Sequence, residues 1–134
     1  MIKLDKETIN RVIVTATENV TITAPVYFLF EFISDSTKFA KVFTAADIST
    51  NTCRYNEFLI EVTTGAEDLL NGVIDLKTNG YYTYNVYQMA SETNLDISLT
   101  SGVVETGKVY LKGDIKPVTS SYTDNDDNKY IAYQ

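Results

Sequence analysis

One stretch of nine residues, Asn79-Gly80-Tyr81-Tyr82-Thr83-Tyr84-Asn85-Val86-Tyr87, constrains the fold of this chain more than any other. Asn and Gly both tolerate a positive φ, so their pair predicts a hairpin turn, and the Tyr-rich segment after it predicts a strand. Successive side chains of a strand point to opposite faces. One face carries Tyr82, Tyr84 and Val86, and the other carries Tyr81, Thr83, Asn85, Tyr87 and Met89. We assign the first set to a core and the second to the surface; a shift by one residue would exchange them.

The start of this strand also indicates the type of sheet protein. The penultimate strand of an immunoglobulin-like domain begins with a Gly that is followed by a Tyr two residues later and by an inward-facing residue two residues after that. Gly80, Tyr82 and Tyr84 fit this pattern, with Tyr84 in place of the usual Cys. Tyr82 would then bond its hydroxyl to nearby backbone, which is a structural role. We therefore predict an all-β fold, an immunoglobulin-like antiparallel β-sandwich of about seven strands.

Strand patterns separated by turn residues recur about every 8–12 residues, which is typical of an all-β sandwich. The predicted strands cover 12–16, 26–33, 38–43, 58–62, 73–76, 81–89 and 107–111. Residues 26–33 are expected to form the central strand and to make a hairpin with 38–43. Residues 95–99 fit either a strand or a loop packed on the core. No segment keeps the 3.6-residue period of an amphipathic helix.

The length of 134 residues, with 44% hydrophobic and 22% charged residues, fits one globular domain. We assign residues 1–112 to the β-sandwich domain and residues 113–134, which are more polar, to an extended C-terminal tail. The tail ends in Tyr130-Ile131-Ala132-Tyr133 beyond a polar spacer. Such a β-prone peptide can add a strand to a neighbouring sheet.

Charge and hydropathy exclude two classes of partner. The net charge of −7 and a pI near 4.4 would repel phosphate backbones, so we predict no nucleic-acid binding. No apolar run approaches the roughly 20 residues that span a bilayer, so we predict no membrane insertion. The first residues lack the apolar segment of a secretory signal, which indicates synthesis in the cytoplasm.

The residue content argues against catalysis. The chain has no histidine and one cysteine, Cys53, which excludes histidine-dependent triads and sites with several thiolates. Glu57 and Glu61 share one face of a predicted strand about 13 Å apart, too far for a glycosidase pair, and are interpreted as a solvated outer face. Residues 124–128 resemble the start of a calcium-binding EF-hand loop, but Lys129 replaces the required Gly. We predict no enzyme activity, no cofactor and no metal site.

Exposed tyrosine and methionine side chains are the predicted contact residues, because these residue types are enriched at protein interfaces. The candidates are Tyr81, Tyr87, Met89 and Tyr110 in the predicted strands, together with Tyr130, Ile131 and Tyr133 in the β-prone end of the tail. Gly80, Tyr82 and Tyr84 are assigned structural roles.

Five segments carry a resemblance to a known group of proteins. They are Phe28-Leu29-Phe30-Glu31-Phe32, Arg54-Tyr55-Asn56-Glu57-Phe58, Leu70-Asn71-Gly72, the strand at 80–87 and Glu105-Thr106-Gly107-Lys108-Val109. As a set, over about residues 26–112, they resemble small virion proteins of tailed bacteriophages, particularly the crAss-like group. The resemblance implies an immunoglobulin-like sandwich that decorates the head or helps to attach head fibres.

The expected function is therefore that of a non-enzymatic structural protein of a phage virion, synthesised in the cytoplasm of the bacterial host. Its expected partners are other virion proteins, capsid or fibre subunits, and the chain is expected to be homo-oligomeric or present in several copies in each particle. One alternative is a structural protein of the tail or baseplate. Another is a carbohydrate-binding adhesin module, since sandwiches can bind sugars on exposed aromatics, although the chain has no Trp.

Overall fold

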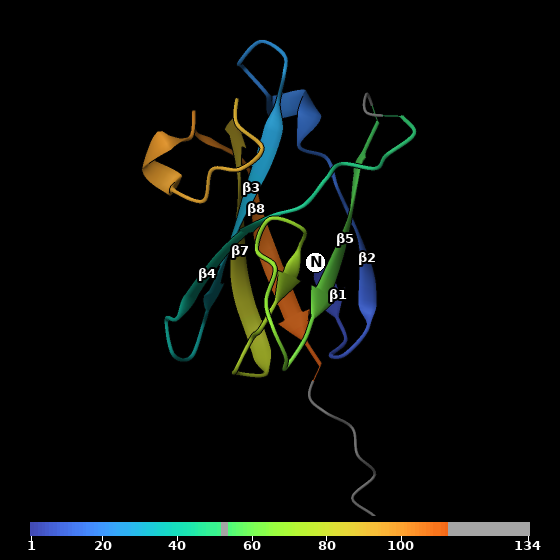
Figure 1. Cartoon of the computed structure of the whole chain (residues 1–134), viewed down its shortest axis with the longest axis vertical. Helices are drawn as coiled ribbons and strands as arrows, with labels where there is room; N and C mark the ends of the chain where they lie inside the picture. Colours follow the sequence, from blue (N-terminus) through green and yellow to red (C-terminus); the bar gives the residue numbers. More distant parts are fainter. Residues whose placement is uncertain (52–53, 113–134) are drawn as a thin grey trace, which may run out of the picture.

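The computed structural model describes residues 1–51 and 54–112 (Figure 1). Its strands are β1 (Ile2–Leu4), β2 (Ile9–Val14), β3 (Tyr27–Ser34), β4 (Ala40–Thr44), β5 (Asn56–Val62), β6 (Val73–Ile74), β7 (Gly80–Met89) and β8 (Val103–Leu111). Two 3-10 helices, η1 (Thr17–Asn19) and η2 (Ile97–Leu99), lie in connections. Over these ranges no helix is long and apolar enough to cross a membrane. The predicted all-β class is confirmed.

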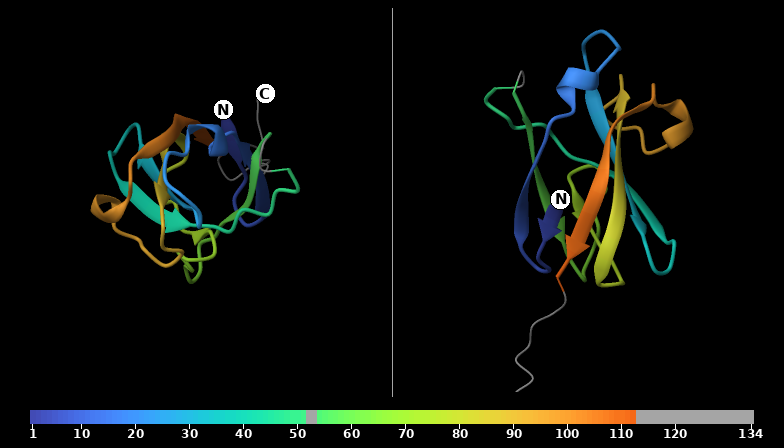
Figure 2. Two further views of the ribbon diagram at one scale, coloured as in Figure 1. Left: turned by 90° about the horizontal axis from the view of Figure 1, so that it is seen from above. Right: turned by 180° about the vertical axis from the view of Figure 1, so that it is seen from behind.

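The strands form two sheets that face each other (Figure 2). The five-stranded sheet has the order β1-β8-β7-β3-β4, and the three-stranded sheet has the order β2-β5-β6. Most neighbours are antiparallel, but β1 with β8 and β5 with β6 are parallel. The expected purely antiparallel pairing is therefore wrong at these two places, where neither pair is joined by a tight hairpin. In the larger sheet β7 is central, rather than β3.

Aromatic side chains connect the two sheets across the core. Phe30 of β3 stacks on Phe43 of β4 with ring centroids 5.2 Å apart. Phe58 of β5 meets Phe30 edge-on at 4.8 Å and Phe28 at 5.9 Å. All four rings are buried, and edge-on and stacked pairs add to the stabilisation from buried area. The alternation of Phe in β3 thus places one continuous face on the core.

The turn at Asn79-Gly80 differs from the expected hairpin. The strand before it, β6, pairs with β5 in the three-stranded sheet, whereas β7 pairs with β3 and β8 in the other sheet. The turn therefore carries the chain from one sheet to the other. Gly80 has φ of +111°, a conformation that favours glycine. The hairpin between β3 and β4 is present as predicted.

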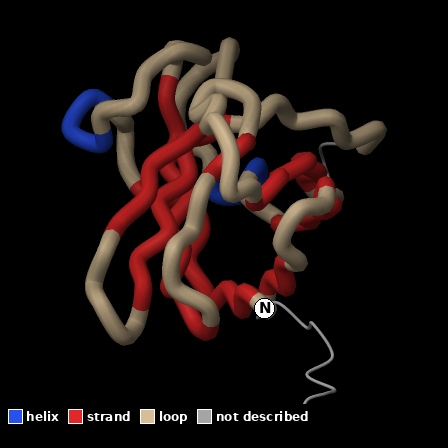
Figure 3. The backbone as a smooth tube through the Cα atoms, turned by 60° about the horizontal axis from the view of Figure 1, so that its bottom comes forward, coloured by secondary structure: helices blue, strands red, loops and turns tan. Residues whose placement is uncertain are grey.

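Met89 is buried, so its assignment to the exposed face of β7 is wrong. The connection between β7 and β8 carries η2, one of the two short helices drawn in blue in Figure 3. Its Asn94 donates a hydrogen bond from Nδ2 to the Met89 sulfur at 3.6 Å. Leu29, on the neighbouring β3, is buried as well but lies outside the main core cluster. Strand alternation gives the face that a side chain takes, but not what covers that face.

Candidate interaction surfaces

The two inward tyrosines of β7 have structural contacts. The Tyr82 hydroxyl donates a hydrogen bond to the Thr78 carbonyl oxygen at 2.5 Å, across the turn between the sheets. Burial raises the pKa of Tyr82 more than this bond lowers it. Tyr82 is therefore an uncharged donor that fixes the approach of the chain to β7.

Tyr84 takes part in a bridge between the sheets. Its hydroxyl donates to Glu105 Oε2 on β8 at 2.8 Å, and Glu105 Oε1 accepts from the Thr15 N–H at 3.2 Å, just beyond β2. We call this the Tyr84–Glu105–Thr15 bridge. Burial, and then the carboxylate of Glu105, raise the pKa of Tyr84 well above its usual value. Gly107 lies directly opposite Tyr84 and leaves space for the tyrosine ring.

Tyr81 and Tyr110 form an aromatic pair on the outer face of the five-stranded sheet. They are directly opposed on β7 and β8, and their ring centroids are 5.0 Å apart. Tyr81 is 53% exposed. Lys3 of β1 lies next to Tyr110 in register and extends the same row toward the edge of the sheet. Lys3, Tyr110 and Tyr81 are called the tyrosine row below.

Tyr87 does not join the tyrosine row. It follows Tyr81 by six positions on the same strand, about 20 Å away. Its hydroxyl donates to Glu31 Oε1 at 2.9 Å, and Asn85 Nδ2 donates to the same oxygen at 3.2 Å. Burial, followed by the proximity of Glu31, raises the pKa of Tyr87 to about 12. The polar end of Tyr87 is therefore engaged within the sheet.

The three remaining candidates, Tyr130, Ile131 and Tyr133, lie outside the described residues. The structure thus brings together Tyr81 and Tyr110, keeps Tyr87 apart from them and buries Met89.

A second exposed apolar surface was not predicted from the sequence. On the outer face of the three-stranded sheet, Ile9 and Ile13 of β2 are 62% and 54% exposed, and Leu59 of β5 is 43% exposed. We call this surface the aliphatic face. The sequence of β2 indicates this surface, because apolar residues occur on both of its faces. Val12 and Val14 point into the core, and Ile9 and Ile13 are on the opposite face.

An ion pair lies within the aliphatic face. The Arg11 guanidinium binds Glu57 through two nitrogens, with Nε 2.5 Å from Oε2 and Nη2 3.0 Å from Oε1. Glu57 raises the pKa of Arg11, mainly through the hydrogen bond and then through its charge. Glu57 is buried, so its assignment to a solvated face is wrong. Arg11 covers it on one side, and Ile48 donates its N–H to the Glu57 carbonyl at 2.8 Å.

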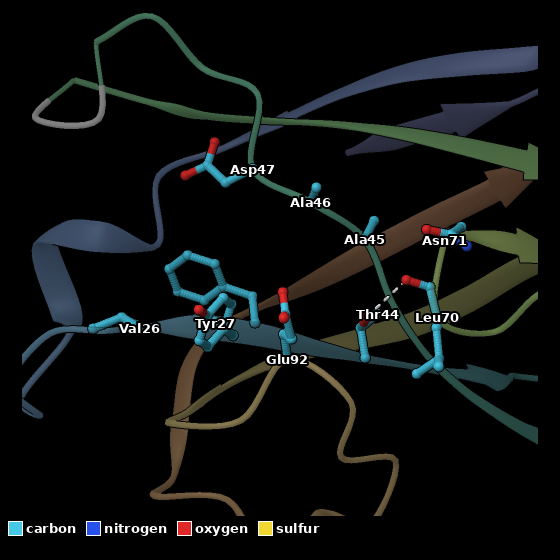
Figure 4. A pocket seen from close by; sticks show the side chains of 10 residues that line it. Val26, Tyr27, Thr44, Ala45, Ala46, Asp47, Leu70, Asn71 and Glu92 are labelled. Atoms are coloured by element: carbon cyan, nitrogen blue, oxygen red, sulfur yellow. Dashed lines mark hydrogen bonds between the residues drawn. The ribbon is translucent and has the colours of Figure 1, made fainter.

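A cavity of about 320 Å³ opens beside the start of β3 (Figure 4). Tyr27, Asp47, Leu70 and Glu92 are among its lining residues. Asp47 accepts bonds from Ser49 and, at 2.7 Å, from the Asn56 amide. Burial acts to raise the pKa of Asp47, but these bonds together hold it below its usual value.

The role of Asp47 is therefore structural, since its oxygens already accept hydrogen bonds from neighbouring groups. In the part of the chain that the structure describes, no group of three or more acidic, histidine or cysteine side chains could hold a metal ion. The surfaces that stand out are the tyrosine row and the aliphatic face. Comparisons of the chain with protein-family models, with curated proteins and with solved structures find no match.

Proposed function

We propose that this chain is a non-enzymatic structural protein of a bacteriophage virion, which decorates the capsid or attaches head fibres through protein contacts. The observation that carries the proposal is the tyrosine row. Tyr81 and Tyr110 already rest on each other, so little side-chain freedom is lost when a partner covers them. Tyr combines a large apolar ring with a hydroxyl, which suits the centre of a protein interface.

The proposed fold is an immunoglobulin-like sandwich. The bond from Tyr82 to Thr78 supports it, because a tyrosine at the start of the penultimate strand makes a similar backbone contact in that fold. The pairing of the last strand, β8, with both β1 and β7 also fits a sandwich in which the first and last strands meet. One departure is β6, which follows β5 in the chain and pairs parallel to it. An immunoglobulin domain instead has its equivalent edge strand before that partner.

A rigid domain of this kind would supply a fixed surface to its neighbours in the particle. The acidic net charge of −7 would favour solubility of the chain before assembly. Location in the tail or baseplate is the alternative closest to this proposal, and it would use the same tyrosine row.

A carbohydrate-binding adhesin module is the alternative from another class. The exposed Tyr81 ring favours it, because sugars stack on exposed aromatic faces. Screening of the isolated protein against glycans, with Tyr81→Ala as the comparison, separates the two readings. Saturable binding that is lost in Tyr81→Ala would support the adhesin and count against a purely structural role.

The main proposal is tested on purified particles of a phage that encodes this chain. We expect mass spectrometry to detect the chain in many copies, and cryo-electron microscopy to place the tyrosine row against another virion protein. A phage carrying Tyr81→Ser and Tyr110→Ser should yield particles depleted of the chain, whereas Tyr87→Phe should leave its copy number unchanged. Particles that lack the wild-type chain would overturn the proposal.

A further inference from the structure

The chain contains two Asn-Gly pairs, Asn71-Gly72 and Asn79-Gly80, which have the same local chemistry but different surroundings. An asparagine followed by glycine is prone to spontaneous deamidation, because glycine has no Cβ atom to shield its backbone nitrogen from the preceding side-chain amide. The reaction requires the backbone of the pair to move until that nitrogen reaches the side-chain carbonyl carbon, Cγ. The packing around each pair therefore decides which asparagine reacts.

The first pair is held on several sides. Asn71 Nδ2 donates a hydrogen bond to Asp68 Oδ2 at 2.7 Å, and the Asn71 N–H donates to the Asp68 carbonyl oxygen at 3.0 Å. Gly72 is buried, and its carbonyl oxygen accepts from the Glu61 N–H at 2.8 Å. A Cβ atom at Gly72 would lie 2.7 Å from the Leu59 carbonyl oxygen, so the Gly72 backbone has no room to rotate.

The second pair is open to solvent. Asn79 is exposed, and its side chain makes no hydrogen bond to another described residue. Beyond its chain neighbours, no heavy atom lies within 4 Å of the place that a Cβ atom of Gly80 would take. Gly80 pairs with Leu111 at the end of the β7–β8 ladder, whereas β3 reaches only to Tyr82. The ends of a ladder open more readily than its centre, so the Gly80 nitrogen is freed without global unfolding.

We propose that Asn79 is a site of spontaneous covalent modification, whereas Asn71 is protected. The Gly80 nitrogen bonds to Asn79 Cγ, the Cγ–Nδ2 bond breaks, and ammonia leaves with a proton that replaces the one lost from the Gly80 N–H. Water then opens the cyclic imide at either of its carbonyl groups. One opening gives aspartate, and the other gives isoaspartate, in which the backbone runs through the side-chain carbon atoms. No oxidant, reductant or enzyme takes part.

Isoaspartate at position 79 alters the turn that carries the chain between the sheets. It adds one methylene group to the backbone immediately after Thr78, whose carbonyl oxygen accepts the hydrogen bond from the Tyr82 hydroxyl. Both products also add one negative charge to the net charge of −7. The isoaspartate form therefore loosens the start of β7, next to Tyr81 of the tyrosine row. The inference does not depend on the proposed virion role.

Incubation of the folded full chain at mildly alkaline pH, followed by tryptic digestion and mass spectrometry, tests the proposal. Trypsin cuts after Arg54, Lys77 and Lys108, so the two Asn-Gly pairs fall in separate peptides, and fragment ions assign the modified residue. We expect the mass increase of an NH2-to-OH exchange at Asn79, with a separate isoaspartate form. The rate at Asn71 should be lower by about tenfold or more. In concentrated urea, where the packing is lost, the two pairs should react at similar rates.

Substitutions separate the site and its consequence. Asn79→Gln lengthens the side chain, which disfavours ring closure, and should abolish the mass increase in its peptide; Asn71→Gln, the same change at the protected pair, should leave it unchanged. Asn79→Asp supplies the charge without the extra methylene group, so its urea midpoint should match that of the unmodified chain. An aged chain that contains isoaspartate should unfold at a lower urea concentration.

Equal rates at Asn71 and Asn79 in the folded chain would overturn the inference. So would a rate at Asn79 no higher than that at Asn85, which lies within β7 and precedes Val86 rather than a glycine. An aged, isoaspartate-containing chain as stable as Asn79→Asp would contradict the loosening of the turn.

Discussion

Gly107→Ala should destabilise the domain through a single contact with Tyr84. The two residues are directly opposed on β8 and β7, and the Tyr84 ring lies over the glycine. A Cβ atom added at Gly107 would lie 2.7 Å from Tyr84 Cε1 and 3.0 Å from both Cζ and the hydroxyl oxygen. Carbon atoms in contact are normally about 3.5–4.0 Å apart, so the ring or β8 must move by several tenths of an ångström.

The size of the effect follows from two opposed contributions. Forcing a methyl group into a packed core costs about 1–3 kcal/mol of unfolding free energy. Replacing Gly by Ala recovers about 0.4–1 kcal/mol, because the unfolded chain loses conformational freedom. The ring cannot move freely, since Tyr84 is buried and its hydroxyl is bound to Glu105. We expect a net loss of about 1–2 kcal/mol.

Urea unfolding followed by far-ultraviolet circular dichroism measures this loss as a lower midpoint at an unchanged slope. Gly65→Ala is the matched control, because its Cβ would meet only Thr63 Oγ1, at 3.6 Å. That variant should be neutral or stabilised by up to about 1 kcal/mol.

A double-mutant cycle assigns the loss to the ring. In a Tyr84→Leu background the ring is absent, and Gly107→Ala should cost less than about 0.5 kcal/mol. Equal stability of Gly107→Ala and wild type, or an unchanged loss in the Tyr84→Leu background, would refute the steric argument.

Three further predictions concern polar groups. Tyr82→Phe removes the hydroxyl bound to Thr78 and should cost about 1–2 kcal/mol in urea unfolding, whereas the same change at exposed Tyr81 should stay within about 0.5 kcal/mol. In the wild type, Asn56 Nδ2 donates a hydrogen bond to Asp47 at 2.7 Å, and Asn56→Asp would replace this donor by a second carboxylate. The change should lower the free energy of unfolding by about 3 kcal/mol at pH 7. Because repulsion raises the pKa values of the two carboxyl groups, the loss measured by thermal unfolding should be smaller at pH 4. The pKa of Tyr87 rises from 10.0 to about 12 on folding, so its contribution to stability is complete below pH 10 and is lost as the pH rises through 12. In Tyr87→Phe the melting temperature should therefore fall less steeply with pH above pH 10 than in the wild type. An unchanged dependence of the melting temperature on alkaline pH would contradict the assignment.

The parts of the fold that depend on local alternation could be predicted from the sequence. The core face of β3 and the inward positions of β7 follow from the two-residue period of a strand. The hairpin from β3 to β4 follows from a short polar turn. The parallel pairing of β1 with β8 has no local signal, because the two strands are at opposite ends of the described chain. The same limit explains Met89, whose burial depends on the connection that follows β7.

The candidate interaction surfaces were predictable to a smaller extent. Tyr81 and Tyr110 could be named because tyrosines on an outer face stand out against polar neighbours. The aliphatic face could not, since apolar residues at both parities of a strand are equally typical of a strand that is buried on both faces. In the structure Ile9 and Ile13 are exposed on the outer face of the three-stranded sheet, and strand alternation alone does not predict whether that face is covered.

The Tyr84–Glu105–Thr15 bridge joins the two sheets without sulfur. The chain has a single cysteine, so no disulfide can form within it. Its folded state is therefore insensitive to the redox potential of the surroundings, unlike that of many secreted sandwiches. Thiol reductants should leave the melting temperature unchanged, and the domain should be equally stable under reducing and oxidising conditions.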